Sequence, residues 1–290
     1  MHCPSLLAAI LASIPLTLAA PSKCASSAPI KCPIVLDGRV KSTLQPTDFD
    51  SYATSPFNPD YVKGNNLKWS DILLFPSTLP TSRFDNASTK PLEVTLSDAS
   101  VFQSQNGFRR AGLQIQGDAN TGSSANTGVR TIHFSVHQDP ARKLNLTHEY
   151  LNVWHEASDY SADQVMFETG TLIGQEAVRK DTFKVLGRNN NLIWSTPIEN
   201  EAWQNFAISI DWGKNTLQVY YSKGDDPLKA VTNKVSNDNA GGGQFQIGML
   251  KKPTGTSDVV NSGYQESGLN EGQIHGGIFI EDSSNGCISL

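Results

Sequence analysis

Glu149 is the residue whose type and surroundings most readily suggest catalysis. It lies in residues 146–150 (LTHEY), where it opens an apolar stretch that we expect to be a strand. Enzymes that cleave glycosidic bonds generally use two carboxyl groups, one as an acid and the other as a base or nucleophile. Glu149 is therefore the candidate catalytic residue. Glu156 and Glu168 also stand at strand ends, but we expect them to be solvated surface acids.

A sugar-binding groove would use residues of two kinds, because sugars offer hydroxyl groups for hydrogen bonds and flat C–H faces for aromatic rings. Tryptophans usually pack in a protein core, and a polar strand face such as His133, Ser135 and His137 is usually only solvated. Membership of a groove therefore depends on how the residues cluster in space. The groove candidates are Trp69, Arg109, Arg110, His133, His137, Glu149, Trp154, Trp194, Trp203 and Trp212.

Several other kinds of chemistry are disfavoured. The chain has no Gly-x-Ser-x-Gly elbow and no His-Glu-x-x-His motif, and the glycines at 241–243 are not followed by Lys and Ser or Thr, so they indicate a loop. The cysteines lack metal-site spacing, and we expect neither a metal nor a cofactor. With 18% charged residues, a net charge of −5 and a pI of about 5.7, the protein suits neutral ligands better than nucleic acid or an anionic membrane.

The N-terminus has the layout of a secretory signal peptide. An apolar run from residue 6 to residue 18 is followed by Ala19 and Ala20, and it is too short to cross a bilayer, which takes roughly 20 apolar residues. We predict a signal peptide at 1–20, a linker at 21–30 and one domain at 31–290. The mature protein is expected to be secreted, extracellular and monomeric.

Cysteines and sequons fit an exported protein. Outside the signal peptide the cysteines are Cys24, Cys32 and Cys287. We favour a Cys32–Cys287 disulfide because each of these residues adjoins a strand-like run at one end of the domain, and a Cys24–Cys32 bond is the competing pairing. Asn86 and Asn145 lie in N-x-Ser/Thr sequons and are the predicted glycosylation sites.

Alternating apolar and polar residues predict many short antiparallel strands. In residues 130–137, Ile132, Phe134 and Val136 share one face, and residues 206–212 and 216–221 form a hairpin around a glycine-containing turn. Only residues 226–231 show a weak helical signal. The further predicted strands are 92–96, 111–116, 148–155, 164–168, 183–186, 191–194, 244–250 and 274–280. The pattern predicts an all-β fold, a two-sheet antiparallel jelly-roll sandwich with a concave glycan-binding groove.

Segments spread over the whole mature chain resemble glycoside hydrolase family 131. They are residues 32–40 (CPIVLDGRV), 55–59 (SPFNP), 68–71 (KWSD), 108–111 (FRRA), 144–150 (LNLTHEY), 248–253 (GMLKKP) and 276–279 (GGIF). The resemblance implies a fungal β-jelly roll that degrades β-glucans with β-1,3, β-1,6 and β-1,4 linkages, without a cofactor and with inversion at the anomeric carbon. It also implies that Glu149 matches a catalytic acid of the family, whereas a second acid is replaced by Gly112 and a histidine by Gln246. We expect Gln246 to be a substrate-binding residue.

Two hypotheses about function follow. In the first, the protein is a β-glucanase in which Glu149 acts as general acid or base, while Arg109 or Arg110 and nearby aromatic residues position the glucan. In the second, the protein binds glucan but is weakly active or inactive, because Gly112 carries no carboxyl group and Gln246 stands in place of a histidine. A polysaccharide lyase fits less well, because the chain is not strongly basic.

Overall fold

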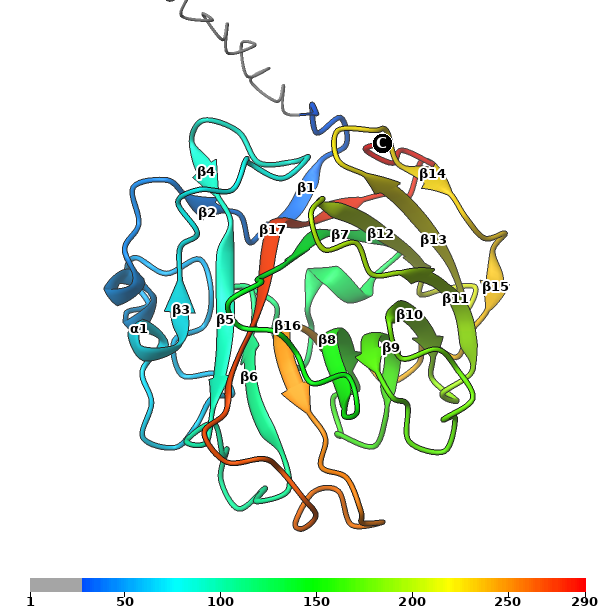
Figure 1. Ribbon diagram of the computed structural model, residues 1–290. Coiled ribbons are helices and arrows are strands. Elements are labelled where there is room, and N and C mark those ends of the chain that lie inside the picture. The colour runs from blue at the N-terminus through cyan, green and yellow to red at the C-terminus, as the bar shows by residue number, and fades with distance from the viewer. Residues whose placement is uncertain (1–27) are drawn as a thin grey trace, which may run out of the picture.

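Two antiparallel β-sheets stack on each other in the computed structural model, which describes residues 28–290 (Figure 1). This arrangement confirms the predicted all-β sandwich. The predicted signal peptide and most of the predicted linker lie outside the described residues. Within residues 28–290, no helix has the length and apolar character that crossing a membrane requires.

The larger sheet has nine strands, and β17, which lies between β7 and β5 in its interior, is the longest. Every pairing in it is antiparallel. Its main path runs in the order β14 (Lys229–Ala230), β13 (Thr216–Lys223), β12 (Gln204–Asp211), β7 (Val129–Gln138), β17 (Asn270–Asp282), β5 (Leu92–Ser97) and β3 (Leu73–Leu74), with β1 (Ile34–Asp37) paired to β17 and β15 (Val235–Ser236) paired to β13.

The smaller sheet has six strands and carries the candidate site. Its order is β11 (Leu192–Pro197), β10 (Thr182–Gly187), β9 (Asp163–Gly170), β8 (Glu149–Glu156), β16 (Gln244–Lys251) and β6 (Arg109–Leu113). The remaining elements are the pair β2 (Val40–Lys41) and β4 (Thr89–Lys90), the short helix α1 (Trp69–Ile72) and two 3₁₀ turns, η1 (Pro46–Asp50) and η2 (Ser124–Asn126). The weak helical signal at 226–231 is wrong, because residues 229–230 form strand β14 on the edge of the nine-stranded sheet.

Phenylalanines from both sheets meet in the core. The ring of Phe167 in β9 lies 4.9 Å from that of Phe134 in β7 and 4.5 Å from that of Phe206 in β12, measured between centroids. All three side chains are fully buried, and burial of each contributes roughly 1.5–3 kcal/mol. The predicted alternation in β7 is confirmed, because Ile132 and Val136 join Phe134 in this core.

The opposite face of β7 is also buried, and this corrects the prediction that His133 binds substrate. His133 stacks on Phe279 with ring centroids 4.4 Å apart, and its Nε2 lies 2.9 Å from the carboxylate of Glu281. Ser289 donates to the same carboxylate from its backbone N–H and its hydroxyl group. The histidine is fully buried in the nine-stranded sheet and has a structural partner.

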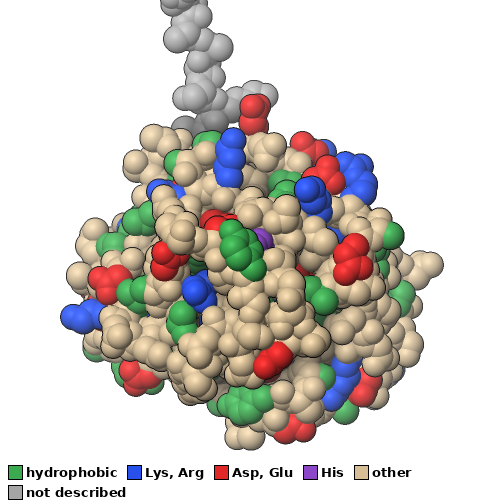
Figure 2. All heavy atoms as spheres, turned by 60° about the horizontal axis from the view of Figure 1, so that its bottom comes forward, with side chains coloured by type: hydrophobic (Ala, Val, Ile, Leu, Met, Phe, Trp, Pro, Cys, Tyr) green, Lys and Arg blue, Asp and Glu red, His purple; other side chains and the backbone are tan. Residues whose placement is uncertain are grey.

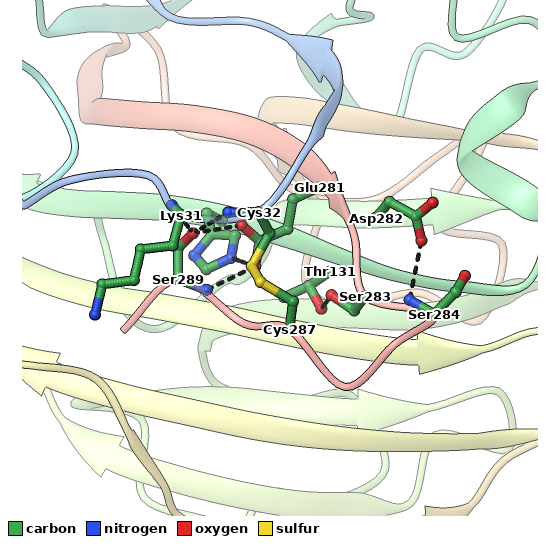
Figure 3. The surroundings of a disulfide bond; sticks show 10 residues. Lys31, Cys32, Thr131, Glu281, Asp282, Ser283, Ser284, Cys287 and Ser289 are labelled. Atoms are coloured by element: carbon green, nitrogen blue, oxygen red, sulfur yellow. Dashed lines mark hydrogen bonds and ion pairs between the residues drawn. A yellow bond between two sulfur atoms is a disulfide. The ribbon is translucent and has the colours of Figure 1, made fainter.

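A disulfide joins Cys32 to Cys287, as the sequence analysis favoured, with the two Cα atoms 5.8 Å apart. It links the segment before β1 to the chain end after β17. Figure 3 shows the bond beside Ser289 and Glu281, with the backbone of Lys31 and Cys32 donating to the Ser289 hydroxyl. The disulfide and this polar cluster hold the two ends of the described chain together.

Replacing Cys287 by Ser is expected to lower the free energy of unfolding by about 4–5 kcal/mol, because the bond closes a loop spanning 255 residues. At about 2–4 °C per kcal/mol, the midpoint of thermal unfolding should fall by about 10 °C or more. Circular dichroism measures the midpoint. Cys24→Ser is the matched control and should leave the midpoint unchanged, and equal midpoints for Cys287→Ser and the wild type would contradict the expectation.

Candidate functional site

The six-stranded sheet carries apolar side chains on both of its faces. Val153, Phe167 and Ile247 point into the core, whereas Trp154 and Met166 belong to a separate cluster on the outer face. Side chains alternate between the faces of a strand, so neighbouring residues of β8, β9 and β16 supply both layers. The outer cluster consists of Phe108, Leu151, Trp154, Met166, Leu172, Leu186 and Leu250.

A cleft lies over this outer cluster. Its wide end has a volume of about 690 Å³ and is lined by Arg110, Glu156, Asp163 and Lys252 among others. Its narrow end has a volume of about 230 Å³, and Glu149 and Glu168 line it together with Lys252. The two ends adjoin, because Lys252 and Val259 line both.

Charged groups of both signs surround the cleft. Figure 2 turns the lower side of Figure 1, where the six-stranded sheet lies, toward the viewer, and acidic and basic side chains are interspersed over that surface. A mixed surface of this kind suits a neutral ligand better than a polyanion. Among residues 28–290, His, Cys, Asp and Glu side chains form no group of three that would hold a metal ion.

Three predicted binding residues come together at the wide end. Arg110 donates from Nη2 to Oε1 of Gln246 at 3.0 Å, and Gln246 donates from Nε2 to Oε2 of Glu156 at 2.5 Å. The Arg110 guanidinium also lies 5.9 Å from the ring centroid of Trp154. Gln246 therefore connects a buried cation to a half-buried carboxylate. Arg109, the neighbour of Arg110 in β6, does not line the cleft. Its Nη1 donates to the backbone oxygens of Asn106 and Phe108.

Gly112 leaves room for the side chain of Gln246. A Cβ atom at position 112 would lie 2.6 Å from Oε1 of Gln246 and 3.5 Å from the Trp154 ring. Any larger residue there would push Gln246 away from Arg110 and Glu156. The glycine at 112 and the glutamine at 246 thus form one local arrangement, in which an amide fills the space that a side chain at 112 would need.

The narrow end holds two buried carboxyl groups. Glu149 is 5% exposed, forms an ion pair with Lys252 and accepts the backbone N–H of Ile173 at 2.5 Å. Glu168 is 2% exposed and lines the same cavity. Leu151 pairs with Glu168 across β8 and β9, so Glu149 and Glu168 are diagonal neighbours on one face, about 7–8 Å apart between their Cα atoms.

Burial raises the pKa of Glu168, and the negative charge of Glu149 raises it further. The prediction that Glu168 is a solvated surface acid is therefore wrong. Glu156 is only half-buried, but it is bonded to Gln246 and faces the cleft, and burial also raises its pKa. At the wide end, burial and the neighbouring Glu156 raise the pKa of Asp163 to about 7.

Other sequence-predicted groove residues lie away from the cleft. His137 is on the nine-stranded sheet, and its ring packs edge-on against Trp203, 5.4 Å away between centroids. The indole N–H of Trp203 donates to the backbone oxygen of Pro80, and that of Trp69 donates to Pro59. Trp69 is fully buried in the core. The prediction that Trp69 binds substrate is therefore wrong, and His137 lies outside this cleft.

Trp194 and Trp212 also pack against the core rather than lining the cleft. Trp154 alone among the five tryptophans lines the cleft, but it is 1% exposed and forms part of the floor. Tyr160 lines the rim of the wide end and is 66% exposed. It therefore offers a sugar more aromatic surface than any tryptophan does. The sequence analysis did not consider Tyr160, because it lies in the turn after β8 outside any strand pattern.

The two sequons lie outside the cleft. The side-chain amide of Asn145 donates to Glu266 at 2.9 Å, and the amide oxygen of Asn86 accepts hydrogen bonds from Ser88. Both asparagines are partly buried. A glycan on Asn145 would need its side chain to leave Glu266, whereas the donor nitrogen of Asn86 has no protein acceptor within residues 28–290. Asn86 is therefore the better placed of the two predicted glycosylation sites.

Replacing Asp163 by Asn is expected to stabilise the protein at alkaline pH. The folded carboxyl titrates near pH 7 and the unfolded one near its ordinary value of 3.8. Between these values the folded state holds a proton that the unfolded state has lost, so stability falls as pH rises. An amide does not ionise and avoids this loss.

Thermal unfolding of Asp163→Asn and wild type should be compared at about pH 3.5 and pH 8. The variant should unfold at a higher temperature only at pH 8, by about 2–4 °C for each kcal/mol recovered. Asp159→Asn makes the same chemical change at an exposed residue of the same hairpin and should bring no such gain. A variant no more stable than wild type at pH 8 would show that Asp163 ionises freely.

Comparisons with known proteins bear on the whole described chain. Residues 34–286 match the family model described as the glycoside hydrolase 131 catalytic N-terminal domain. The structure is similar to the catalytic domain of a GH131 β-glucanase from Podospora anserina, with a TM-score of 0.69 and 22% identity over 86% of this chain and 96% of that one. It is also similar to the catalytic domain of a family 131 protein from Coprinopsis cinerea, with a TM-score of 0.66 and 22% identity over 86% and 94%. No curated protein matches.

Proposed function

Because the chain belongs to glycoside hydrolase family 131, we propose that it hydrolyses β-glucan and that the polymer lies in the cleft on the outer face of the six-stranded sheet. The observation that carries this proposal is the presence of Glu149 in the cleft beside a second carboxyl group. Enzymes that hydrolyse glycosidic bonds generally use such a pair. The proposed substrates are β-1,3-, β-1,6- and β-1,4-linked glucans.

In this proposal Glu149 is the base. Both of its oxygens accept hydrogen bonds from protein donors, the Lys252 ammonium and the Ile173 N–H. Such a carboxylate is better placed to accept a proton from water than to donate one. Lys252 also lines both ends of the cleft, so it is positioned to hold Glu149 in place while a glucan occupies the neighbouring space.

Substrate binding in this proposal relies on Arg110, Gln246 and the rim residue Tyr160. Arg110 lines the wide end, Gln246 lies beneath it and accepts a hydrogen bond from Arg110, and Tyr160 offers an exposed ring for a flat sugar face. Trp154 supports Arg110 from below. Arg109, Trp69, His133 and His137 have no part in the proposed site, because none of them lines the cleft.

A second candidate function is glucan binding with little or no hydrolysis. It is favoured by the absence of a carboxyl group at Gly112, where Gln246 fills the available space. A protein of this kind would be retarded by β-glucan in an affinity gel and would release no product. Replacing Gly112 by Glu would then bring hydrolysis only if Gln246 swings aside.

We further propose that the chain is exported, with cleavage after Ala19 or Ala20, and that the mature protein acts outside the cell as a monomer with one domain at 31–290. Glycans at Asn86 and Asn145 belong to the same proposal. The Cys32–Cys287 disulfide supports it, because such bonds persist in oxidising compartments.

Glu149→Gln is expected to lower glucan hydrolysis at least about 100-fold, because general base catalysis typically contributes 10²–10⁴-fold. Laminarin, barley mixed-linkage glucan and carboxymethyl-cellulose are incubated with the purified mature protein, and reducing ends are measured. Asp226→Asn, an exposed acid outside the cleft, is the control and should retain wild-type rates. If folded wild-type protein releases no reducing ends from any of the three, it is not a β-glucanase.

Tyr160→Ala is expected to weaken retention on a β-glucan affinity gel by about 2–10-fold, which corresponds to the 0.5–1.5 kcal/mol typical of an aromatic contact. Tyr264→Ala is a matched control, since Tyr264 is 63% exposed and does not line the cleft. Equal retention of both variants would place the sugar elsewhere.

A further inference from the structure

Glu168 is a buried acid that sequence patterns assign to the surface, and it lies beside the proposed base. We propose that Glu168 is the proton donor for glycosidic cleavage and supplies the carboxyl group that Gly112 lacks. This inference rests on the proposed function. The acid would then come from β9, the strand next to that of Glu149, and not from position 112 in β6 at the edge of the sheet.

The first support is position. Glu149 and Glu168 stand on the same face of adjacent strands, and both line the narrow end of the cleft. Their Cα atoms are diagonal neighbours, roughly 7–8 Å apart. Two carboxyl side chains at that spacing can flank a bond between two sugar units, with one group on each side.

The second support is the open space at the carboxyl group. Glu168 is only 2% exposed as a residue, and it lines the narrow end of the cleft. Its two carboxyl oxygens are not among the fully buried, unpaired polar atoms of residues 28–290, so they are open to this cavity. A substrate oxygen in the narrow end can therefore reach the carboxyl group of Glu168.

The third support is electrostatic. The charged groups facing Glu168 are Glu149 on β8, Asp163 on its own strand, Lys184 on β10 and Lys252 after β16. Burial and the two acids raise the pKa of Glu168, and the two lysines oppose that rise without cancelling it. Glu168 therefore keeps a proton to higher pH than an ordinary glutamate. Neighbouring carboxyl groups with different environments are a recognised way to assign acid and base roles.

The reaction then balances with water as the only co-reactant. Glu168 gives its proton to the glycosidic oxygen as the C1–O bond breaks, and the bonding electron pair stays on that oxygen. A water molecule forms the new C1–O bond and gives a proton to the Glu149 carboxylate. One sugar leaves as an alcohol and the other as a hemiacetal, with Glu168 ionised and Glu149 protonated. Proton exchange with solvent restores both groups.

The test compares Glu168→Gln with wild type on two kinds of substrate. Barley mixed-linkage glucan has a poor leaving group that needs a proton, whereas a dinitrophenyl β-gluco-oligosaccharide has a leaving group that departs without one. Loss of the proton donor should lower kcat on the glucan at least about 100-fold and change kcat on the aryl substrate less than about 10-fold. Loss of a merely structural group would lower both rates alike.

Controls and pH profiles complete the experiment. Asp159→Asn should behave as wild type, and circular dichroism confirms that each variant is folded. Wild-type activity should fall as pH rises through the elevated pKa of Glu168, because the acid then loses its proton. The residual activity of Glu168→Gln on the aryl substrate should show no such fall at alkaline pH.

Each outcome distinguishes the inference from the proposed function. No turnover by wild type contradicts both. Wild-type turnover with a fully active Glu168→Gln contradicts only the inference, as does an equal loss on both substrates. If Asp163→Asn shows the leaving-group signature and Glu168→Gln does not, the proton comes from Asp163 and the assignment to Glu168 is wrong.

Discussion

The ion pair between Lys252 and Glu149 is the contact on which the candidate site depends. Burying a charged group costs far more free energy than burying a neutral one, unless an opposite charge and hydrogen bonds replace the lost solvent. Lys252 and the Ile173 N–H provide that replacement for Glu149. Glu168, one strand away, has no equivalent partner, so its burial acts on its protonation instead. The two neighbouring glutamates thus differ in their partners, because Lys252 forms an ion pair with Glu149.

At the wide end of the cleft, a buried charge is also compensated by a partner, here through an amide. Arg110 is 5% exposed, and the amide of Gln246 links it to the half-buried Glu156. That link exists because Gly112 has no side chain to occupy the space. The glycine is therefore more than a missing acid, since it permits an Arg–Gln–Glu chain of hydrogen bonds under the cleft.

The nine-stranded sheet carries contacts that stabilise the fold. Its outer face buries the His133–Glu281 pair, and Ser289 and the disulfide close over that pair from the chain ends. His133, which the sequence analysis proposed as a sugar-binding residue, thus belongs to the polar cluster beside the disulfide that joins the two ends of the domain.

The sequence by itself determined the fold class, the Cys32–Cys287 pairing and the identity of the family, because alternation, cysteine context and family segments are local properties of the chain. It also singled out Glu149, Arg110 and Trp154, which line one cleft in the tertiary structure, and Gln246, which is bonded to Arg110 beneath that cleft. It did not separate these residues from His133, His137 and Trp69. Strands of both sheets show the same period of two, and that pattern does not reveal which sheet a strand joins or what covers its outer face. The burial of Glu168 was decided only by tertiary structure. It depends on the pairing of β8 with β9 and on Lys252, which directly follows β16 and lies 84 positions further along the chain.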